Sequence, residues 1–210
     1  DGYSISDTCT INVNTWNHFG IVRISGLINF YLNGNLVSSH SHSADYTYTG
    51  SDPLYIGRQY EGSWEHNGYI DELRISKGIA RWTENFTPPV VPYSVPIIGG
   101  NDAYTKLLLH MDGTDDGTTF TDDSASSHTV TRYNALTKTS VKQLGTASGY
   151  FDGSGDYLTV PDSEDWDFGA GDFTIDFWTY STVAINTGIS DIRVILCLGS
   201  TGLRVAYGCG

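Results

Sequence analysis

The amino-acid sequence predicts an all-β protein. Short apolar segments, most of them alternating with polar residues, recur along the 210 residues and are separated by Gly, Asn, Asp and Ser. Alternation with a period of two is typical of strands that bury one face. The composition agrees, since 24 Gly, 14 Tyr, 8 Phe and 5 Trp against a single Met suit a turn-rich β protein. The spacing of these segments predicts an antiparallel sandwich or a barrel.

Each strand is expected where an apolar segment ends in turn residues. Residues 18–24 alternate up to the turn at Gly26, and residues 27–32 run into Asn33-Gly34, the strongest short signal for a β-hairpin. The same pattern predicts further strands at residues 7–12, 53–56, 68–75, 106–111, 156–160, 172–178, 193–198 and 202–207. Residues 76–83 are the only helix candidate, and we expect a short turn there at most.

A proline-rich segment divides the chain. Four of the six prolines lie between Pro88 and Pro96. Because proline lacks the backbone N–H and fixes an extended backbone, we expect residues 88–104 to be a semi-rigid linker, edge or docking segment and not a central strand. It separates residues 1–87 from residues 105–210, and a domain count based on this segment alone would give two.

The charge balance excludes several functions. The 11 Lys and Arg against 24 Asp and Glu give a formal net charge of −13. Nucleic acid is thereby excluded as a partner, because phosphate binding needs clustered basic residues, and an anionic membrane surface is disfavoured. No run of 18 apolar residues occurs, so the sequence predicts no membrane-spanning segment.

The setting of the protein is indicated by a sequon and by the cysteines. Asn85-Phe86-Thr87 is an acceptor for N-glycosylation at Asn85, and with the acidic, Tyr-, Thr- and Ser-rich composition it favours an extracellular protein. The three cysteines have no metal-ligand spacing, so they are either small buried residues or one disulfide and a free thiol. Because the sequence begins at Asp1 without an initiator Met or a signal peptide, we expect the natural N-terminus to lie elsewhere.

Two parts of the chain resemble the two halves of a known domain, in inverted order. Residues 94–210 resemble the N-terminal half of a laminin-G-like domain of the concanavalin A-like lectin/glucanase superfamily, on the segments 107–113, 121–124, 150–160 and 172–178. Residues 9–87 resemble its C-terminal half, on the segments 15–19, 30–34, 54–57 and 68–75. The resemblance implies a concanavalin A-like jelly roll, with halves 94–210 and 1–93 forming one sandwich within the chain or with a neighbouring copy.

The inverted order has three physical explanations. The chain is one permuted sandwich closed through residues 88–104, one period of a tandem array, or a unit that completes its sheets with a neighbouring copy. The last two give an end-to-end fibre, and we favour them. Joining Gly210 to Asp1 restores the order of the family and places Cys9 and Cys209 on either side of one hairpin, so the resemblance implies these two cysteines as a disulfide pair.

The resemblance also provides a test for catalysis. Laminarinase-type glucanases share this sandwich and carry Glu-x-Asp-x-x-Glu on one strand, because retaining hydrolysis needs two carboxyl groups about 5–5.5 Å apart. In the corresponding segment of this chain only Asp176 is acidic, and Thr174 and Trp178 stand where further carboxylates would be needed. No nucleophile elbow, zinc-protease motif or phosphate loop occurs either, so we expect no catalytic residues.

A calcium site is implied by resemblance to related sandwiches, which often hold a structural Ca²⁺ beside an Asp of a C-terminal strand. Asp71 is the first candidate ligand, and the others are Asp112, Asp122 and Asp123, with Asp115 and Asp116 nearby. Ca²⁺ requires several hard oxygen ligands, which carboxylates supply. The alternative is that these residues are solvated and favour turns. A weaker resemblance, to the pentraxin calcium loop, points to Gln59 and Glu61.

A glycan site is suggested by aromatic and polar residues in one expected loop. Rings that stack on sugars, with hydrogen-bonding groups beside them, make such sites. The candidates are Tyr60, Trp64, Glu65, His66 and Asn67, with Tyr46 and Tyr48 alternating on a nearby segment. The alternative is ordinary packing of these side chains.

These observations favour a non-enzymatic, extracellular structural unit of a head-to-tail fibre or surface appendage. Its expected partners are copies of itself and glycans, and its expected cofactor is calcium. The alternative is a carbohydrate-binding adhesin module, as in phage tail fibres or secreted bacterial proteins. A third interpretation, a glucanase, would need a second carboxylate opposite Asp176.

Overall fold

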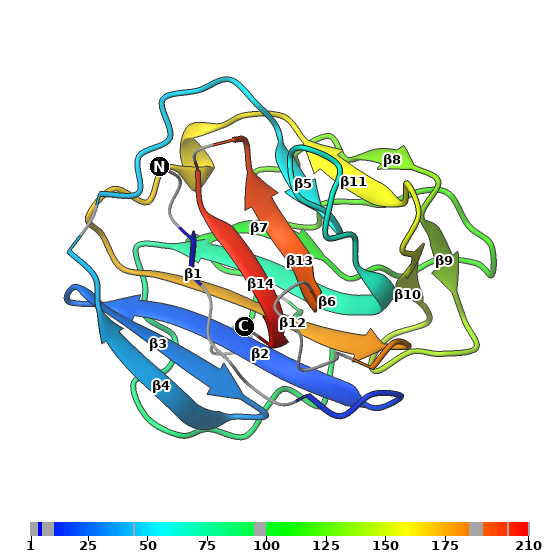
Figure 1. Ribbon diagram of the computed structural model, residues 1–210, viewed down its shortest axis with the longest axis horizontal. Helices are drawn as coiled ribbons and strands as arrows, with labels where there is room; N and C mark the ends of the chain where they lie inside the picture. Colours follow the sequence, from blue (N-terminus) through cyan, green and yellow to red (C-terminus); the bar gives the residue numbers. More distant parts are fainter. Residues whose placement is uncertain are drawn as a thin grey trace.

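The chain forms two β-sheets that pack face to face, as Figure 1 shows. The computed structural model describes residues 4–5, 11–43, 45–94, 100–184, 191–200 and 202–209. Within these ranges the only helical element is one 3₁₀ turn, Glu164–Trp166. The prediction of an all-β sandwich is therefore confirmed. No helix in the described ranges is long and apolar enough to cross a membrane.

The larger sheet has eight strands and contains the centre of the molecule. Its order is β4 (Asn35–Ser41), β3 (Leu27–Leu32), β2 (Trp16–Ile24), β12 (Phe173–Ser181), β6 (Asn67–Lys77), β10 (Ser148–Asp152) and β9 (Leu136–Lys138), and β7 (Thr105–Leu109) also pairs with β6. All of these pairs are antiparallel. We call it the large sheet.

The second sheet, called the small sheet, has six strands. Its order is β1 (Ser4–Ile5), β14 (Arg204–Cys209), β13 (Asp191–Leu198), β5 (Leu54–Ile56), β11 (Tyr157–Val160) and β8 (Thr131–Tyr133). The pairs are antiparallel apart from β1 with β14, which is parallel. The expected strand at 7–12 falls mostly outside the described residues, whereas the short strands β1, β8, β9 and β10 were not predicted.

The core lies between the two sheets, where the alternating apolar residues of both meet. From the large sheet, Phe19 and Phe177 stack with ring centroids 5.4 Å apart. From the small sheet, Ile56 and Leu158 are fully buried in the same cluster. Burying each such side chain contributes about 1.5–3 kcal/mol of hydrophobic stabilisation. The residues that do so are those at the apolar positions of the alternating pattern.

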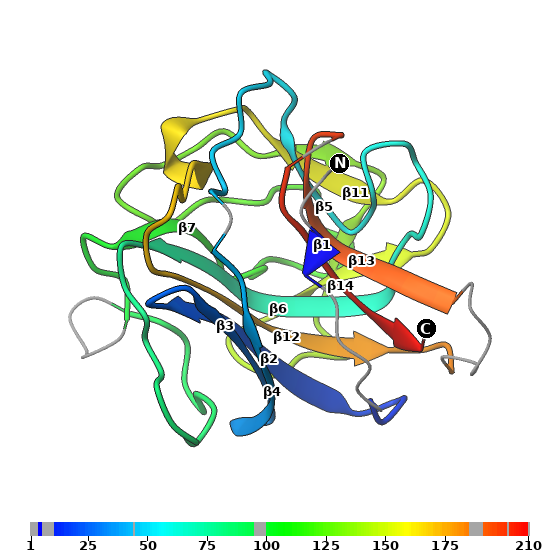
Figure 2. The same ribbon diagram turned by 60° about the vertical axis from the view of Figure 1, so that its left-hand side comes forward.

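The large sheet is also covered on its outer face. Along β2 and β12 nearly every residue is buried, including those that alternate away from the core. The cover is the segment of residues 79–94, which follows β6 and which we call the covering segment. Figure 2 shows it running along the side of the large sheet that faces away from the small sheet. The ring of Trp82 lies over Gly20, where a Cβ would be 3.4 Å from it.

The two halves of the chain are interleaved in both sheets. Strands β1 to β6 come from residues 1–87, and β7 to β14 come from residues 105–210. In the large sheet β12 lies between β2 and β6, and in the small sheet β5 lies between β13 and β11. Figure 1 shows this mixture as orange beside blue and cyan strands. The halves thus form one sandwich within the chain, in inverted order relative to the resemblance.

The hairpin between β3 and β4 forms as the Asn33-Gly34 pair predicts. Both residues have positive φ, 51° and 79°, as the tight turn of a two-residue hairpin requires. The turn also holds the covering segment, because the backbone N–H of Phe86 donates to the carbonyl of Gly34 at 2.9 Å. A Cβ on Gly34 would be 1.9 Å from the Phe86 carbonyl oxygen.

Two glycine substitutions test this contact. Gly26 has almost the same φ, 78°, but nothing lies within 4 Å of its Cβ position. We expect Gly26→Ala to lower the free energy of unfolding by about 1 kcal/mol through backbone strain alone. Gly34→Ala should lower it by a further ~2 kcal/mol, because residue 86 must also move. Urea denaturation measures both, and equal losses would mean that the covering segment does not rest on this turn in solution.

Candidate functional site

The predicted glycan loop forms one side of an open depression. Trp64, in the loop between β5 and β6, has a positive φ of 54°. The guanidinium of Arg204 lies 4.8 Å from the centroid of its ring. The depression has a volume of about 260 Å³ and is lined by Gly62, Ser63, Trp64, Glu65, Asn67, Gly153 and Arg193. Three of the five predicted residues are therefore brought together at one surface.

The other predicted glycan residues are placed differently. His66 is fully buried, its Nδ1 lies 3.0 Å from the hydroxyl of Tyr207, and burial lowers the pKa of its imidazole to about 3. The prediction of His66 as a ligand-contacting residue is wrong, because β6 begins beside it and turns its side chain into the core. Tyr60 packs against Tyr55 at 5.9 Å and does not line the depression. Tyr46 and Tyr48 are buried.

The predicted pentraxin-like pair also has a structural role. The side-chain oxygen of Gln59 lies 3.4 Å from the hydroxyl of Ser63, and the backbone N–H of Gln59 donates to the carbonyl of Ser63. These bonds close a turn. Glu61 is exposed at its tip, and no described cluster of acidic residues adjoins it.

Asp71 and Asp112 hold one loop between them. The Asp71 carboxylate accepts backbone N–H groups of Gln143 and Leu144 at 2.9 and 3.0 Å, and Asp112 accepts those of Thr146 and Ala147. Asp71 is fully buried, and its Oδ1 has no hydrogen-bond partner among the described residues. Burial raises the pKa of the Asp71 carboxyl to about 7, and the nearby charges of Glu72 and Asp112 act in the same direction.

The four predicted calcium ligands do not converge. Both Asp122 oxygens accept hydrogen bonds, from the backbone N–H groups of Leu108, Ser124 and His128 and from the Ser124 hydroxyl, so Asp122 orders its own turn. Asp123 is exposed. In the described part of the chain no three His, Cys, Asp or Glu side chains are grouped to hold a metal ion. The prediction that these four Asp residues form one calcium site is therefore wrong. Only Asp71 and Asp112 lie at the same loop.

A buried polar cluster lies on the outer face of the large sheet. Arg74 of β6 and Asp176 of β12 form a bidentate ion pair, with Nε–Oδ1 and Nη2–Oδ2 distances of 3.0 and 3.3 Å. Tyr93 of the covering segment completes it: its hydroxyl donates to Asp176, and its ring lies 3.7 Å from the Arg74 guanidinium. Arg74 and Asp176 are essentially inaccessible to solvent, and Tyr93 is buried.

The electrostatics of this cluster favour the charged pair. Burial opposes ionisation of Asp176, but the Arg74 guanidinium outweighs it and holds the pKa of the carboxyl below its usual range. Burial likewise opposes the charge of Arg74, and Asp176 keeps its pKa raised. Burial and the carboxylate raise the pKa of Tyr93 well above the usual value, so its hydroxyl remains a donor.

Aromatic and charged residues surround the pair. The His18 ring lies between the rings of Trp82, Phe86 and Trp178 at 5.0–5.7 Å, and its Nε2 is 3.9 Å from Asp176. Glu72 accepts the backbone N–H of Tyr93 at 3.1 Å and contacts His110 at 2.7 Å. A cavity of about 380 Å³ opens beside Tyr93, and its lining includes Arg81, Trp82 and Pro89.

The glucanase-like segment is engaged in this packing. Thr174 and Trp178 share the outer face with Asp176, and the Thr174 hydroxyl donates to the Ile79 carbonyl at 3.0 Å. Trp178 is buried against His18. The face that carries carboxylates in glucanases is here occupied by the chain's own covering segment.

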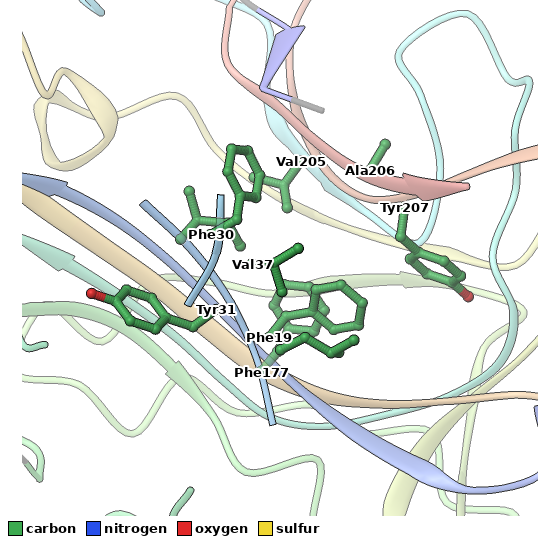
Figure 3. Close-up of a pocket in the computed structure, with 10 residues that line it drawn as sticks. Phe19, Phe30, Tyr31, Val37, Phe177, Val205, Ala206 and Tyr207 are labelled. Carbon is green, nitrogen blue, oxygen red and sulfur yellow. The ribbon is translucent and has the colours of Figure 1, made fainter. Parts of the chain in front are cut away.

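A small apolar slot lies between the sheets where they separate. Figure 3 shows the side chains that line it, from β2, β3, β4 and β12 of the large sheet and from β14 of the small sheet. Phe19, Phe177 and Val205 are among its lining residues. Its volume of about 20 Å³ is close to that of one water molecule, so it is a packing gap.

The modification sites are placed as follows. Asn85 is exposed, and its side-chain oxygen accepts the backbone N–H of Leu36 at 2.8 Å. Cys197 is a buried free thiol. The predicted pairing of Cys9 with Cys209 cannot be placed, because Cys9 lies outside the described residues.

Sequence reasoning missed Arg74, Glu72 and Tyr93 as a group. Arg74 and Asp176 each stand in an apolar alternating segment, and a charge at such a position signals a partner on the neighbouring strand. No comparable signal exists for Tyr93, since its position depends on the path of the covering segment across the sheet.

The comparisons with known proteins agree with this fold. Residues 1–84 match the family model described as "Concanavalin A-like lectin/glucanases superfamily", of the laminin-G type. This match, over residues 1–84 of the 210, supports a laminin-G-like domain of that superfamily. Searches of curated proteins and of solved structures returned no match.

Proposed function

We propose that this chain is a non-enzymatic, extracellular structural unit of a fibre or surface appendage. In such an assembly, one half of the sandwich pairs with the complementary half of the next copy. The observation that carries the proposal is the interleaving of the halves: β12 pairs with β2 and β6, while one connection, residues 88–104, joins the halves. A single hinge between complementary parts is what an exchange between copies requires.

Neither half can close a sandwich by itself. Among the described residues of 1–87, the only strands that pair with one another are β2 with β3 and β3 with β4, so the apolar faces of β5 and β6 depend on the other half. An open sheet with unpaired edges and an apolar face associates with any complementary strand. The same pairings that close one chain can therefore link successive chains.

The burial of Asp176 supports a role without catalysis. Its carboxylate is bound by Arg74 and Tyr93 and covered by residues 79–94, so it is inaccessible to a sugar. The sequon at Asn85 supports an extracellular setting. A glycan there would stand beside the edge strand β4, because Asn85 is bonded to Leu36 of that strand, and it would protect this edge from unwanted pairing.

Particle size, measured before and after denaturation, tests the assembly. We expect light scattering to show particles that grow with protein concentration and dissolve in denaturant to units near 23.0 kDa. Exchange between copies is concentration-dependent, whereas closure within a chain is not. A single species near 23.0 kDa at every concentration would overturn the proposal.

We also propose that calcium rigidifies the loop held by Asp71 and Asp112. The buried Oδ1 of Asp71 has no partner among the described residues, and a cation would neutralise two neighbouring carboxylates. Backbone carbonyls and water would complete the coordination, because two carboxylates alone are too few ligands for Ca²⁺.

Calcium titration of thermal stability tests this site. Saturating Ca²⁺ should raise the Tm by about 5 °C, since ligand binding stabilises the folded state. Asp71→Asn should abolish the increase. Asp123→Asn, which removes the same charge from an exposed residue, is the matched control and should keep it. An unchanged wild-type Tm, or an equal response of both variants, would exclude calcium binding by Asp71.

Glycan binding by the depression at Trp64 is the second candidate function. Its support is the grouping of an aromatic ring with Glu65, Asn67 and Arg193 around a volume of about 260 Å³, suited to one or two sugar rings. As an adhesin module, the domain would present this surface at a fibre or on a cell.

A glycan array with matched variants tests this candidate. Specific binding by the wild type, reduced about tenfold or more in Trp64→Ala, is expected if the ring stacks on sugar. Tyr104→Ala removes another exposed ring, 47% accessible and outside the depression, and should bind as the wild type does. Binding that resists Trp64→Ala would place the ligand elsewhere.

A further inference from the structure

We propose that Arg74, Asp176 and Tyr93 form the element by which the two halves recognise each other, and that its partner in trans is a second copy of this chain. The inference rests on the proposed function and deepens it. It assigns the choice of partner and the register of pairing to the fully buried ion pair at the centre of the interface between the halves.

The cluster is divided between the halves. Arg74 belongs to residues 1–87 and Asp176 to residues 105–210, while Tyr93 lies near the start of the connection, residues 88–104. Tyr93 is attached to the first half by its N–H bond to Glu72 and by the contact of its ring with Arg74. The bidentate ion pair and the Tyr93 hydroxyl bond reach across to Asp176. The first half, with Tyr93 attached to it, therefore holds a preformed binding site for a carboxylate. The second half supplies that carboxylate.

The cluster specifies the register of the central strand pair. Asp176 and Arg74 are direct partners across β12 and β6. A slip of two residues would keep Arg74 on the outer face but place it opposite Thr174 or Trp178, neither of which is charged. A slip of one residue would move every side chain to the other face. In either case Arg74 and Asp176 would be buried without each other.

The ion pair contributes more to the selection of the correct partner than to the strength of the association between the halves. A buried ion pair contributes little compared with apolar residues of the same size, whereas removing one partner leaves a buried charge unpaired. Most of the contact between the halves is apolar and would accept many complementary surfaces. The cluster penalises every surface that lacks a carboxylate at the place of Asp176, and a second copy carries one there.

Two single variants, mixed together, test the inference in the full chain. Arg74→Met leaves Asp176 without its partner, and Asp176→Leu leaves Arg74 without its partner. If the two chains exchange halves, one interface joins Arg74 with Asp176 and the other joins two apolar residues. Each variant is to be labelled with a different fluorophore, and the two are to be refolded together and separately.

We expect mixed assemblies to exceed those of either variant alone by a factor on the order of 100, because breaking a buried pair from one side is strongly destabilising. The double variant, which carries both changes in one chain, should fold and assemble with itself. Arg81→Met is the matched control: it removes the bidentate Arg81–Asp102 pair, whose carboxylate lies in the connecting segment, and from the second half it removes only a neutral hydrogen bond to Thr105. That variant should show no preference for either partner.

The possible outcomes separate the two proposals. If wild-type chains exchange halves but the two variants show no preference for each other, the recognition proposal is wrong and the structural unit stands. If wild-type chains never exchange, the structural unit is wrong and a second copy is excluded as the partner. In that case recovery of folding by the double variant would still support recognition between the halves of one chain, and its absence would overturn it.

Discussion

The pairing of β12 with β6 is the interaction on which the rest of the structure depends. These strands come from opposite halves of the chain, lie at the centre of the large sheet and are buried on both faces. On the core side Ile175 and Ile75 face each other in the apolar cluster. On the outer side Arg74 and Asp176 meet under Tyr93. The sandwich cannot close, and the covering segment has no surface to rest on, until this pair has formed.

A β-bulge in β6 lets this strand place polar residues on the outer face of the large sheet and an apolar residue in the core. The register between the two strands shifts between Asp176 and Trp178, where Glu72 adopts a φ of 51°. Because of this extra residue, Asp71, Glu72 and Arg74 all escape the core, while Leu73 remains in it. The charged residues then serve three separate purposes: one holds a loop, one binds the Tyr93 backbone, and one pairs with Asp176.

Much of the fold could be predicted from the sequence, because alternation and turn chemistry are local. The Asn33-Gly34 hairpin and the apolar segments of β2, β3, β12 and β13 needed no knowledge of tertiary contacts. The short strands β8 and β9 carry too few residues to show a period. The loop with Trp64 was recognisable from its local turn residues. His66 was misplaced, because the residue at which β6 begins decides which side chains point into the core.

The candidate sites were less accessible to sequence reasoning. Asp71 and its grouping with Asp112, Asp122 and Asp123 were both taken from a family pattern, in which an Asp of a C-terminal strand meets an N-terminal strand and its loop. That pattern does not specify which side chains of the loop reach the strand. Asp122 instead accepts its hydrogen bonds from its own turn and from Leu108 of β7. The role of Tyr93 depends on a path across the sheet, and such a path leaves no local mark in the sequence.

The prolines of the covering segment have a consequence for how the protein resists aggregation. Pro88, Pro89 and Pro92 have no backbone N–H, so this stretch offers few donors with which to form a ladder. It is held on the outer face of the large sheet by side chains and by a few isolated backbone bonds, such as those of Phe86 and Tyr93, and forms no ladder that a foreign strand could extend. A cover of this kind can lie across a sheet, or be lifted from it, without becoming a seed for amyloid-like growth.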